Sequence, residues 1–99
     1  MTPFVVTRKA EDDLRNIWAY SRIKWGEEQA DKYYHEFIAT CDYISKYPML
    51  GRSYDIVIQQ LRGIQFGKHI IFYVVQNSER VLIIRVLHIS MDVNTSLKE

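Results

Sequence analysis

Five basic side chains in the second half of the chain have the residue types that phosphodiester chemistry needs. They are Arg62, Lys68, His69, Arg85 and His88. Histidine can act as an acid or a base near neutral pH, and arginine can bind a phosphate through two hydrogen bonds. The segment RVLHISMD places two of the five at the end of an otherwise apolar run. These residues predict either a ribonuclease-like site or structural side chains at the end of a strand.

The structural interpretation of Arg85 and His88 follows from the geometry of a strand. Side chains alternate between the two faces, so Arg85 shares a face with Val81, Ile83 and Leu87, and His88 lies on the other face. Arg85 would then pack its stem and hydrogen-bond its guanidinium near the end of the sheet. His88 would hydrogen-bond to the following tail, at Asp92. The functional interpretation instead gives Arg85 a contact with an acidic partner or a phosphate.

Length and composition predict one domain built around a single core. The chain has 99 residues, a formal net charge of +1 and one cysteine, Cys41. A chain of this size buries roughly two thirds of the surface that its unfolded form exposes. A single cysteine excludes an intrachain disulfide and fits a reducing cytoplasm, and the low net charge does not favour a nucleic-acid-binding protein. We therefore expect a cytoplasmic protein with no membrane span, no cofactor and no metal site.

Periodicity predicts two antiparallel helices. After the β-prone segment FVV (4–6), Thr7 is a candidate N-cap, and apolar residues recur at steps of three and four. Gly26 ends the first helix and Pro48 ends the second. The predicted inner faces are as follows: Ala10, Leu14, Ile17, Trp18, Ser21 and Trp25 in the first helix, and Ala30, Tyr33, Tyr34, Phe37, Cys41 and Ile44 in the second.

Three β-rich segments follow the helices, namely LRGIQF, HIIFYVVQ and RVLIIRVLH. The short connections GK and NSE between them have hairpin length. The predicted fold is α+β with the order β-α-α-β-β-β, in which a helical hairpin packs on one face of a mainly antiparallel sheet. The single domain of 1–99 then divides into a hairpin (8–47), a three-stranded antiparallel segment (61–88) and a polar tail (89–99) that only docking would order.

Four segments give the sequence a resemblance to a known family. They are AEDDLRNIWAYSRIKWGEEQA, YPMLGRS, LRGIQFGKHIIFYVV and IIRVLHISMD, and they span roughly residues 4 to 93. In their order and spacing they resemble the ParE toxins of bacterial type II toxin–antitoxin pairs, within the RelE/ParE superfamily. The resemblance implies a RelE/ParE-like fold and a toxin that poisons DNA gyrase, blocks replication and is not an enzyme. It also implies a ParD-like antitoxin that forms a hetero-oligomer with the toxin.

Two other functions remain open. RelE-like members resemble ribosome-dependent messenger-RNA endonucleases, and here His88, Arg85 and Arg62 would carry that chemistry. Such relatives often place a catalytic tyrosine close to the C-terminus, whereas the last tyrosine of this chain is Tyr73. This difference favours the gyrase-poisoning branch, with no catalytic residue. The third possibility is a protein without toxicity that persists as an antitoxin-binding module.

The resemblance and the residue types together predict two contact surfaces. A disordered acidic and apolar antitoxin segment can fold on binding and cover a groove or a sheet edge. The predicted antitoxin contacts are Trp18, Arg52, Arg62, His69 and Arg85, and the predicted target contacts are Arg85, His88, Met91 and Asp92. Trp18 has an alternative role in packing within the helical hairpin. We expect no direct, sequence-specific binding of nucleic acid by the toxin alone.

Overall fold

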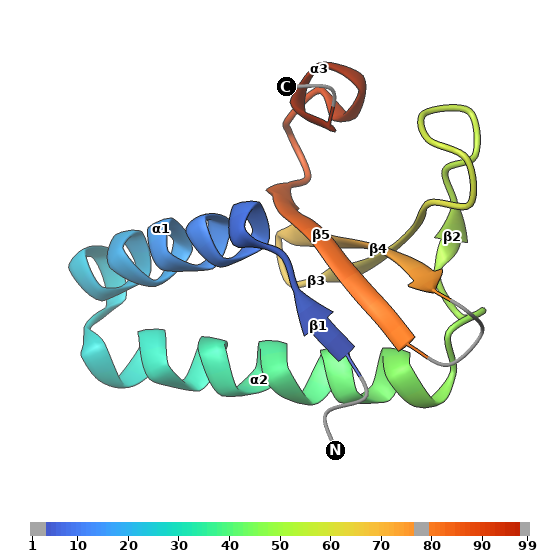
Figure 1. Cartoon of the computed structure of the whole chain (residues 1–99). Coiled ribbons are helices and arrows are strands. Elements are labelled where there is room, and N and C mark those ends of the chain that lie inside the picture. The colour runs from blue at the N-terminus through green and yellow to red at the C-terminus, as the bar shows by residue number, and fades with distance from the viewer. Residues whose placement is uncertain (1–3, 77–79, 98–99) are drawn as a thin grey trace.

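The computed structural model describes residues 4–76 and 80–97, and Figure 1 shows the arrangement of their helices and strands. The elements are β1 (Phe4–Val6), α1 (Arg8–Trp25), α2 (Glu27–Lys46), β2 (Arg52–Ser53), β3 (Arg62–Phe66), β4 (His69–Gln76), β5 (Arg80–His88) and α3 (Val93–Leu97). The predicted β-α-α-β-β-β order is confirmed, with β2 and α3 as short additions. The predicted connection at residues 77–79 lies outside the described residues.

The strands form one mixed sheet in the order β1-β5-β4-β3-β2. β1 pairs with β5 in parallel, and all the other pairs are antiparallel. The backbone N–H of Thr7 extends the parallel pair by donating to the carbonyl of Ile83 at 3.0 Å. The fold class is therefore the expected one, and the first strand joins the sheet next to the last.

Local signals fix the ends of the two long helices. Thr7 caps α1, since its hydroxyl oxygen accepts a hydrogen bond from the backbone N–H of Ala10 at 3.2 Å. Gly26 separates α1 from α2 with a φ of 98°, a value that side chains with a Cβ rarely adopt. The second helix ends at Lys46, two residues before Pro48. The hairpin is thus built as the sequence predicts.

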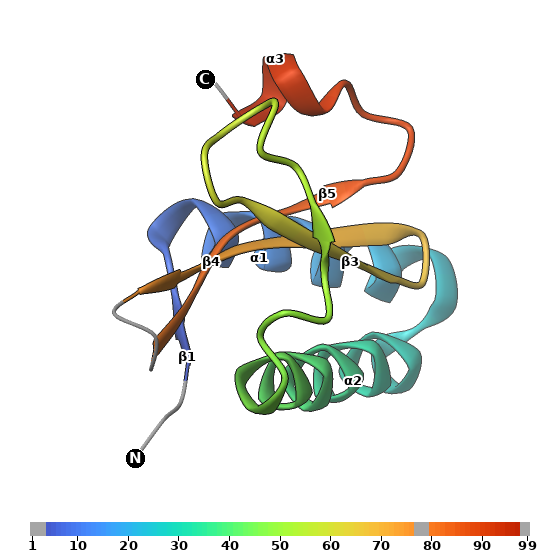
Figure 2. The ribbon, with the colours of Figure 1, turned by 90° about the vertical axis from the view of Figure 1, so that its right-hand side faces the viewer.

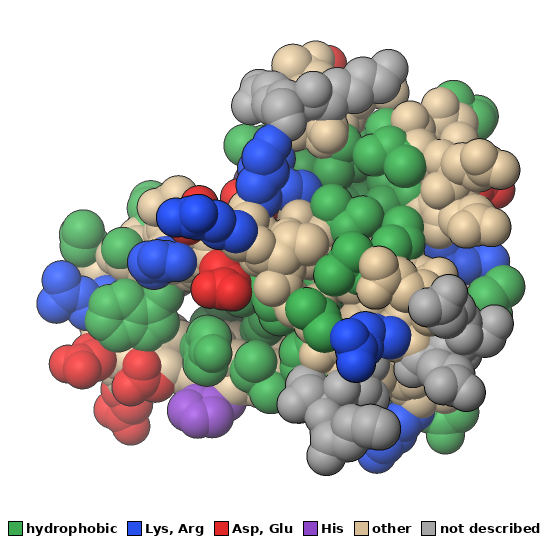
Figure 3. Space-filling model, viewed as in Figure 1, with side chains coloured by type: hydrophobic (Ala, Val, Ile, Leu, Met, Phe, Trp, Pro, Cys, Tyr) green, Lys and Arg blue, Asp and Glu red, His purple; other side chains and the backbone are tan. Residues whose placement is uncertain are grey.

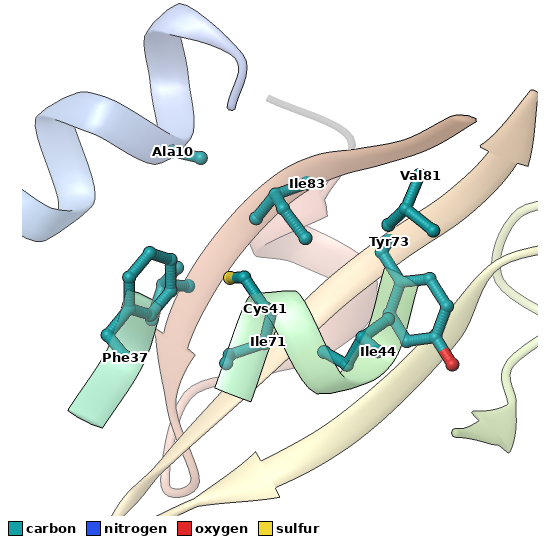
Figure 4. Packing of buried hydrophobic residues seen from close by; sticks show 9 residues of the cluster. Ala10, Phe37, Cys41, Ile44, Ile71, Tyr73, Val81 and Ile83 are labelled. Atoms are coloured by element: carbon teal, nitrogen blue, oxygen red, sulfur yellow. The ribbon is translucent and has the colours of Figure 1, made fainter. Parts of the chain in front are cut away.

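The main core lies between the helical hairpin and one face of the sheet (Figure 4). Ala10 of α1 and Phe37, Cys41 and Ile44 of α2 meet Ile71, Tyr73, Val81, Ile83 and Val86 of the sheet. Burial raises the pKa of the Cys41 thiol to about 12, so this cysteine is a small apolar side chain rather than a nucleophile. The predicted inner position is wrong for two residues. Trp25 is 65% exposed and Tyr34 is 45% exposed, because both lie off the face that the helices turn toward the sheet.

A β-bulge in β5 corrects the predicted alternation of its side chains. Phe72 pairs with Arg85 whereas Tyr73 pairs with Ile83, so Ile84 is an extra residue in the strand. The hydroxyl of Thr7 donates to the carbonyl of Ile84 at 2.9 Å and so supports the bulge. As a result Ile83 belongs to the main core, whereas Arg85 lies on the face of Phe72. The prediction that Arg85 shares a face with Val81 and Ile83 is therefore wrong.

A second apolar cluster covers the opposite face of the sheet. It consists of Leu61, Phe72 and Leu87, against which partly buried side chains from α3 and from the segment before β3 pack. Figure 2 shows α2 below the sheet and α3 above it. Val93 and Leu97 are the α3 residues in this cluster. Part of the polar tail is therefore a helix docked on the sheet of this same chain. None of the helices described here is long and apolar enough to cross a membrane.

Candidate functional site

A groove of about 740 Å³ lies between α1, the first turns of α2 and the turn that joins β3 to β4. We call it the hairpin groove. Its walls are Asn16, Ile17, Tyr20, Ser21, Lys24 and Trp25 of α1, Gln29 and Tyr33 of α2, Gly67 and Lys68 of the β3–β4 turn, and His69 and His88 of the sheet. Its size and its mostly apolar lining with a few polar groups are typical of ligand sites.

Three titratable side chains from three elements meet at the sheet side of the groove. The hydroxyl of Tyr33 lies 2.7 Å from Nδ1 of His69 and also donates to the carbonyl of Phe66 at 3.3 Å. His69 and His88 are paired residues of β4 and β5, and their ring centroids are 5.4 Å apart in an edge-to-face arrangement. The two histidines are 19 positions apart in sequence, and only the strand pairing brings them together.

The tautomer of His88 follows from its hydrogen bonds. The backbone N–H of Ser90 donates to Nδ1 of His88 at 3.1 Å, and the Ser90 hydroxyl lies 2.7 Å from the same atom. Because Nδ1 accepts from the backbone, the proton of the neutral ring is on Nε2. The predicted bond to Asp92 is wrong, since Asp92 instead accepts from the backbone N–H groups of Asn94 and Thr95 at the start of α3.

His69 is half-buried, and its surroundings disfavour the charged ring. Burial is the main cause that lowers the pKa of His69, and the neighbouring His88 lowers it further. Asp13 acts in the opposite direction. The Tyr33 hydroxyl has its pKa raised by burial and by Glu36, so it stays protonated. The surroundings of Tyr33 and His69 therefore favour the neutral form of each side chain.

Aromatic side chains line the end of the groove where α1 meets α2. Tyr20 and Trp25 are both more than half exposed, and so is the neighbouring Ile23. Figure 3 shows hydrophobic side chains interspersed with basic and acidic ones at this end of the hairpin. The ammonium of Lys24 lies 5.6 Å from the ring centroid of Tyr20 and 5.7 Å from that of Trp25, and it donates to the Tyr20 hydroxyl at 3.2 Å. The arrangement leaves a large apolar surface beside a cation.

Arg85 belongs to a different constellation. Its Nε donates to Oδ2 of Asp13 at 2.8 Å and its Nη2 to Oδ1 at 3.0 Å, so the pair is bidentate. Oδ2 of Asp13 also accepts from the backbone N–H of Val86 at 2.9 Å, and Nη1 of Arg85 donates to the carbonyl of Ser96 at 2.9 Å. This network joins α1, β5 and α3, which is the structural role that the sequence offered for Arg85.

Arg62 and Arg52 lie at the other edge of the sheet. Nη1 of Arg62 donates to the carbonyls of Gly51 at 2.7 Å and Met49 at 3.3 Å. Tyr73 holds the same loop, because its hydroxyl accepts from the N–H of Gly51 at 2.9 Å and donates to the carbonyl of Pro48 at 2.7 Å. Arg52 is exposed on β2, with its guanidinium carbon 5.9 Å from the Tyr54 ring centroid.

The structure therefore divides the predicted site residues among separate places. His69 and His88 meet in the hairpin groove, Arg85 is in the network with Asp13, and Arg52 and Arg62 are near the loop between α2 and β2. Trp18 is on α1, where its indole N–H donates to Asp31 of α2 at 3.0 Å. Met91 is exposed between β5 and α3, and Asp92 is exposed at the start of α3. Within the described ranges, no three metal-ligating side chains form a site.

Sequence reasoning missed two residues that complete these constellations. Asp13 is one of three consecutive acids (residues 11–13), and it lies three residues after Ala10 and four before Ile17, both on the inner face. A partly buried arginine in the sheet also requires a partner of opposite charge, such as this carboxylate. Tyr33 was treated as packing alone. Its hydroxyl needs a partner when half-buried, and that requirement was the available signal.

Comparison with known proteins gives consistent matches over nearly the whole chain. A family model described as the ParE toxin of the type II toxin–antitoxin system parDE matches residues 4–93. The chain is 40% identical over 97 residues to Toxin ParE1 of Caulobacter vibrioides, covering 98% of this chain and 99% of that protein. It is 31% identical over 94 residues to Toxin ParE1 of Mycobacterium tuberculosis, covering 95% and 96% respectively.

A solved structure has a similar fold. It is described as the chromosomal ParDE system from P. aeruginosa, and the match has a TM-score of 0.75 with 19% identity. The match covers 89% of this chain and 96% of that chain. At this level of identity the likeness concerns the architecture of the sheet and the hairpin.

Proposed function

Because this chain belongs to the ParE toxin family of type II toxin–antitoxin systems, we propose that it inhibits DNA gyrase in the cytoplasm and is neutralised by a ParD-like antitoxin. Inhibition would leave cleaved DNA bound to gyrase and stall replication. The observation that carries the proposal is the family match over residues 4–93, together with relatives that are similar from end to end. The chain is the toxin of such a pair, and the proposal concerns its target and its antitoxin.

The surroundings of the arginines support a protein that is not an enzyme. A ribonuclease of the RelE type would use Arg62 and Arg85 for the charge on the phosphate. Arg62 donates to two loop carbonyls, and Arg85 donates to Asp13 and to the carbonyl of Ser96. Guanidinium groups held in this way would have to break internal hydrogen bonds before they could bind RNA. His88 is at the hairpin groove and has neither arginine beside it among the groove-lining residues.

A ParD-like antitoxin would have to wrap the toxin to reach all the predicted contacts. Trp18, Arg52 and His69 are on α1, β2 and β4, and a flexible segment can follow such a path by folding on binding. The hairpin groove with its exposed aromatic rim is an apolar surface along that path. We propose that the antitoxin covers this groove and extends to the exposed guanidinium of Arg52.

A supercoiling assay tests the proposed target. Purified toxin is mixed with gyrase, relaxed plasmid and ATP, with and without antitoxin. We expect loss of supercoiling and accumulation of linear, gyrase-bound plasmid, both reversed by the antitoxin. If gyrase is unaffected by a toxin that circular dichroism shows to be folded, the target assignment is wrong, and cleavage of messenger RNA on ribosomes becomes the next assay.

A charge-reversal pair tests the proposed antitoxin surface. Arg52→Glu should weaken the complex by about tenfold, because it replaces a favourable contact with a carboxylate by a repulsive one. Arg80→Glu, at an exposed position on β5, is the matched control and should leave affinity unchanged. Equal affinities for the two variants would remove Arg52 from the interface.

A further inference from the structure

The titratable side chains that line the hairpin groove are lysines, histidines and tyrosines. The cations are Lys24 and Lys68, and the histidines are His69 and His88. Among the described residues that line the groove, no side chain is a carboxylate. The chain as a whole carries 13 basic and 12 acidic residues, so this local imbalance differs from the average surface. The groove is therefore complementary to an anionic ligand.

The donors for an anion are at the sheet side of the groove. His88 presents a proton on Nε2, since its Nδ1 is committed to the backbone N–H of Ser90. Lys68 is adjacent, because its carbonyl accepts from the backbone N–H of Ile89 at 2.9 Å. Gly67 forms the turn before Lys68 with a φ of 58°, which fixes the position of the lysine at the rim. Lys68 and His88 thus have neighbouring backbone positions, and both residues line the groove.

The opposite end of the groove offers flat apolar surface. Tyr20 and Trp25 are on α1, and Lys24 lies against both rings. Tyr20 and Trp25 line the groove from α1, whereas Lys68 and His88 line it from the β3–β4 turn and β5, so a ligand in the groove can contact both walls. Exposed aromatic rings beside a cation are the features on which nucleobases stack.

We propose that the hairpin groove binds a free nucleoside phosphate, with the phosphate at Lys68 and His88 and the base against Tyr20 and Trp25. A pocket of about 740 Å³ is within the range of small-ligand sites. A long nucleic-acid strand is the weaker alternative, because the chain has a net charge of only +1 and only two lysines line the groove. The proposal concerns the free toxin, because the proposed antitoxin would cover the same groove, and it is independent of whether the toxin acts on gyrase.

Tryptophan fluorescence provides a direct test, since the chain has two tryptophans and only Trp25 lines the groove. AMP is titrated up to about 10 mM into the full-length Trp18→Phe variant, in which Trp25 is the only reporter. We expect saturable quenching with a dissociation constant on the order of 0.1–1 mM, as a few charged hydrogen bonds and one stacked base would give. The Trp25→Phe variant, which keeps Trp18, should show no saturable change. An unchanged spectrum of folded Trp18→Phe protein at the highest concentration would overturn the proposal.

Variants of the donors test the phosphate end by calorimetry. Lys68→Ala and His88→Ala should each weaken AMP binding by about tenfold, because each removes one charge-assisted or fixed hydrogen bond. His88→Gln should retain binding, since the glutamine amide N–H₂ replaces the Nε2 proton. Lys46→Ala, at the far end of α2, is the control and should bind AMP as the unmodified chain does. Equal affinity for Lys68→Ala and Lys46→Ala would overturn the assignment of the phosphate, even if His88→Ala fails to fold.

Comparison of ligands separates the free nucleotide from other occupants. Adenosine and inorganic phosphate should each bind at least about tenfold more weakly than AMP, because each fills only one end of the groove. Tighter binding of a single-stranded oligonucleotide than of AMP would overturn the assignment to a free nucleotide. Saturable binding of an acidic amphipathic peptide with no response to AMP would overturn the nucleotide assignment and leave the groove to a protein partner.

Discussion

Replacing Asp13 with alanine is expected to destabilise the fold by about 3 kcal/mol, because it leaves a largely buried arginine without its carboxylate. The side chains of Arg85 and Asp13 are 15% and 14% exposed and form two hydrogen bonds. Breaking a buried pair from one side costs roughly 3–5 kcal/mol. Loss of the acceptor for the Val86 N–H adds to this cost, whereas the bond from Arg85 to the Ser96 carbonyl reduces it. The lower end of the range is therefore expected.

Urea denaturation of matched variants measures this cost. Asp12→Ala is the control, since Asp12 is one residue away and its ion pair with Arg15 is exposed, at 59% and 67% for the two side chains. That exposed pair should contribute less than about 0.5 kcal/mol. In a thermal scan, Asp13→Ala should lower Tm by about 12–24 °C, at 4–8 °C per kcal/mol for a domain of this size.

A double variant separates the net contribution of the ion pair from the cost of leaving one buried partner unpaired. Asp13→Leu combined with Arg85→Met replaces both charges by apolar side chains of similar size, and it should recover more than half of the stability lost in Asp13→Ala. If Asp13→Ala and Asp12→Ala differ by less than about 1 kcal/mol, the bidentate pair does not hold α1 to β5 and the reasoning is refuted.

Three further predictions concern other parts of the fold. Tyr73→Phe should lower the free energy of unfolding by about 1–3 kcal/mol, since the buried N–H of Gly51 loses its acceptor; a change below about 0.5 kcal/mol in urea would contradict this. Because the pKa of His69 is lowered in the folded state, the unfolded chain binds more protons, and the free energy of unfolding should fall as the pH drops below about 6.5. In urea denaturation at a series of pH values, His69→Asn should make this dependence on pH less steep. Removal of residues 89–99 should abolish toxicity while leaving a folded but less stable domain; a shortened chain that still arrests growth would remove the tail from target contact.

Local sequence determined the helical hairpin and the order of the strands. Thr7 and Gly26 act through contacts within a few residues, so their roles as a cap and a separator can be read directly from the sequence. The β-rich segments after Pro48 likewise have a period that differs from that of the helices. The resemblance to ParE toxins was also contained in the order of these segments, and the family match confirms it.

Tertiary structure alone decided where the candidate functional residues lie. Under strict alternation Arg85 would share a face with Ile83, but the bulge at Ile84 places it on the opposite face. The alternating pattern of the sequence does not reveal the bulge. Asp13 and Arg85 are 72 positions apart, and strand pairing brings His69 to His88. Such contacts depend on which segments pair and in which register, and these are set by the summed packing of the whole core rather than by the residues that meet.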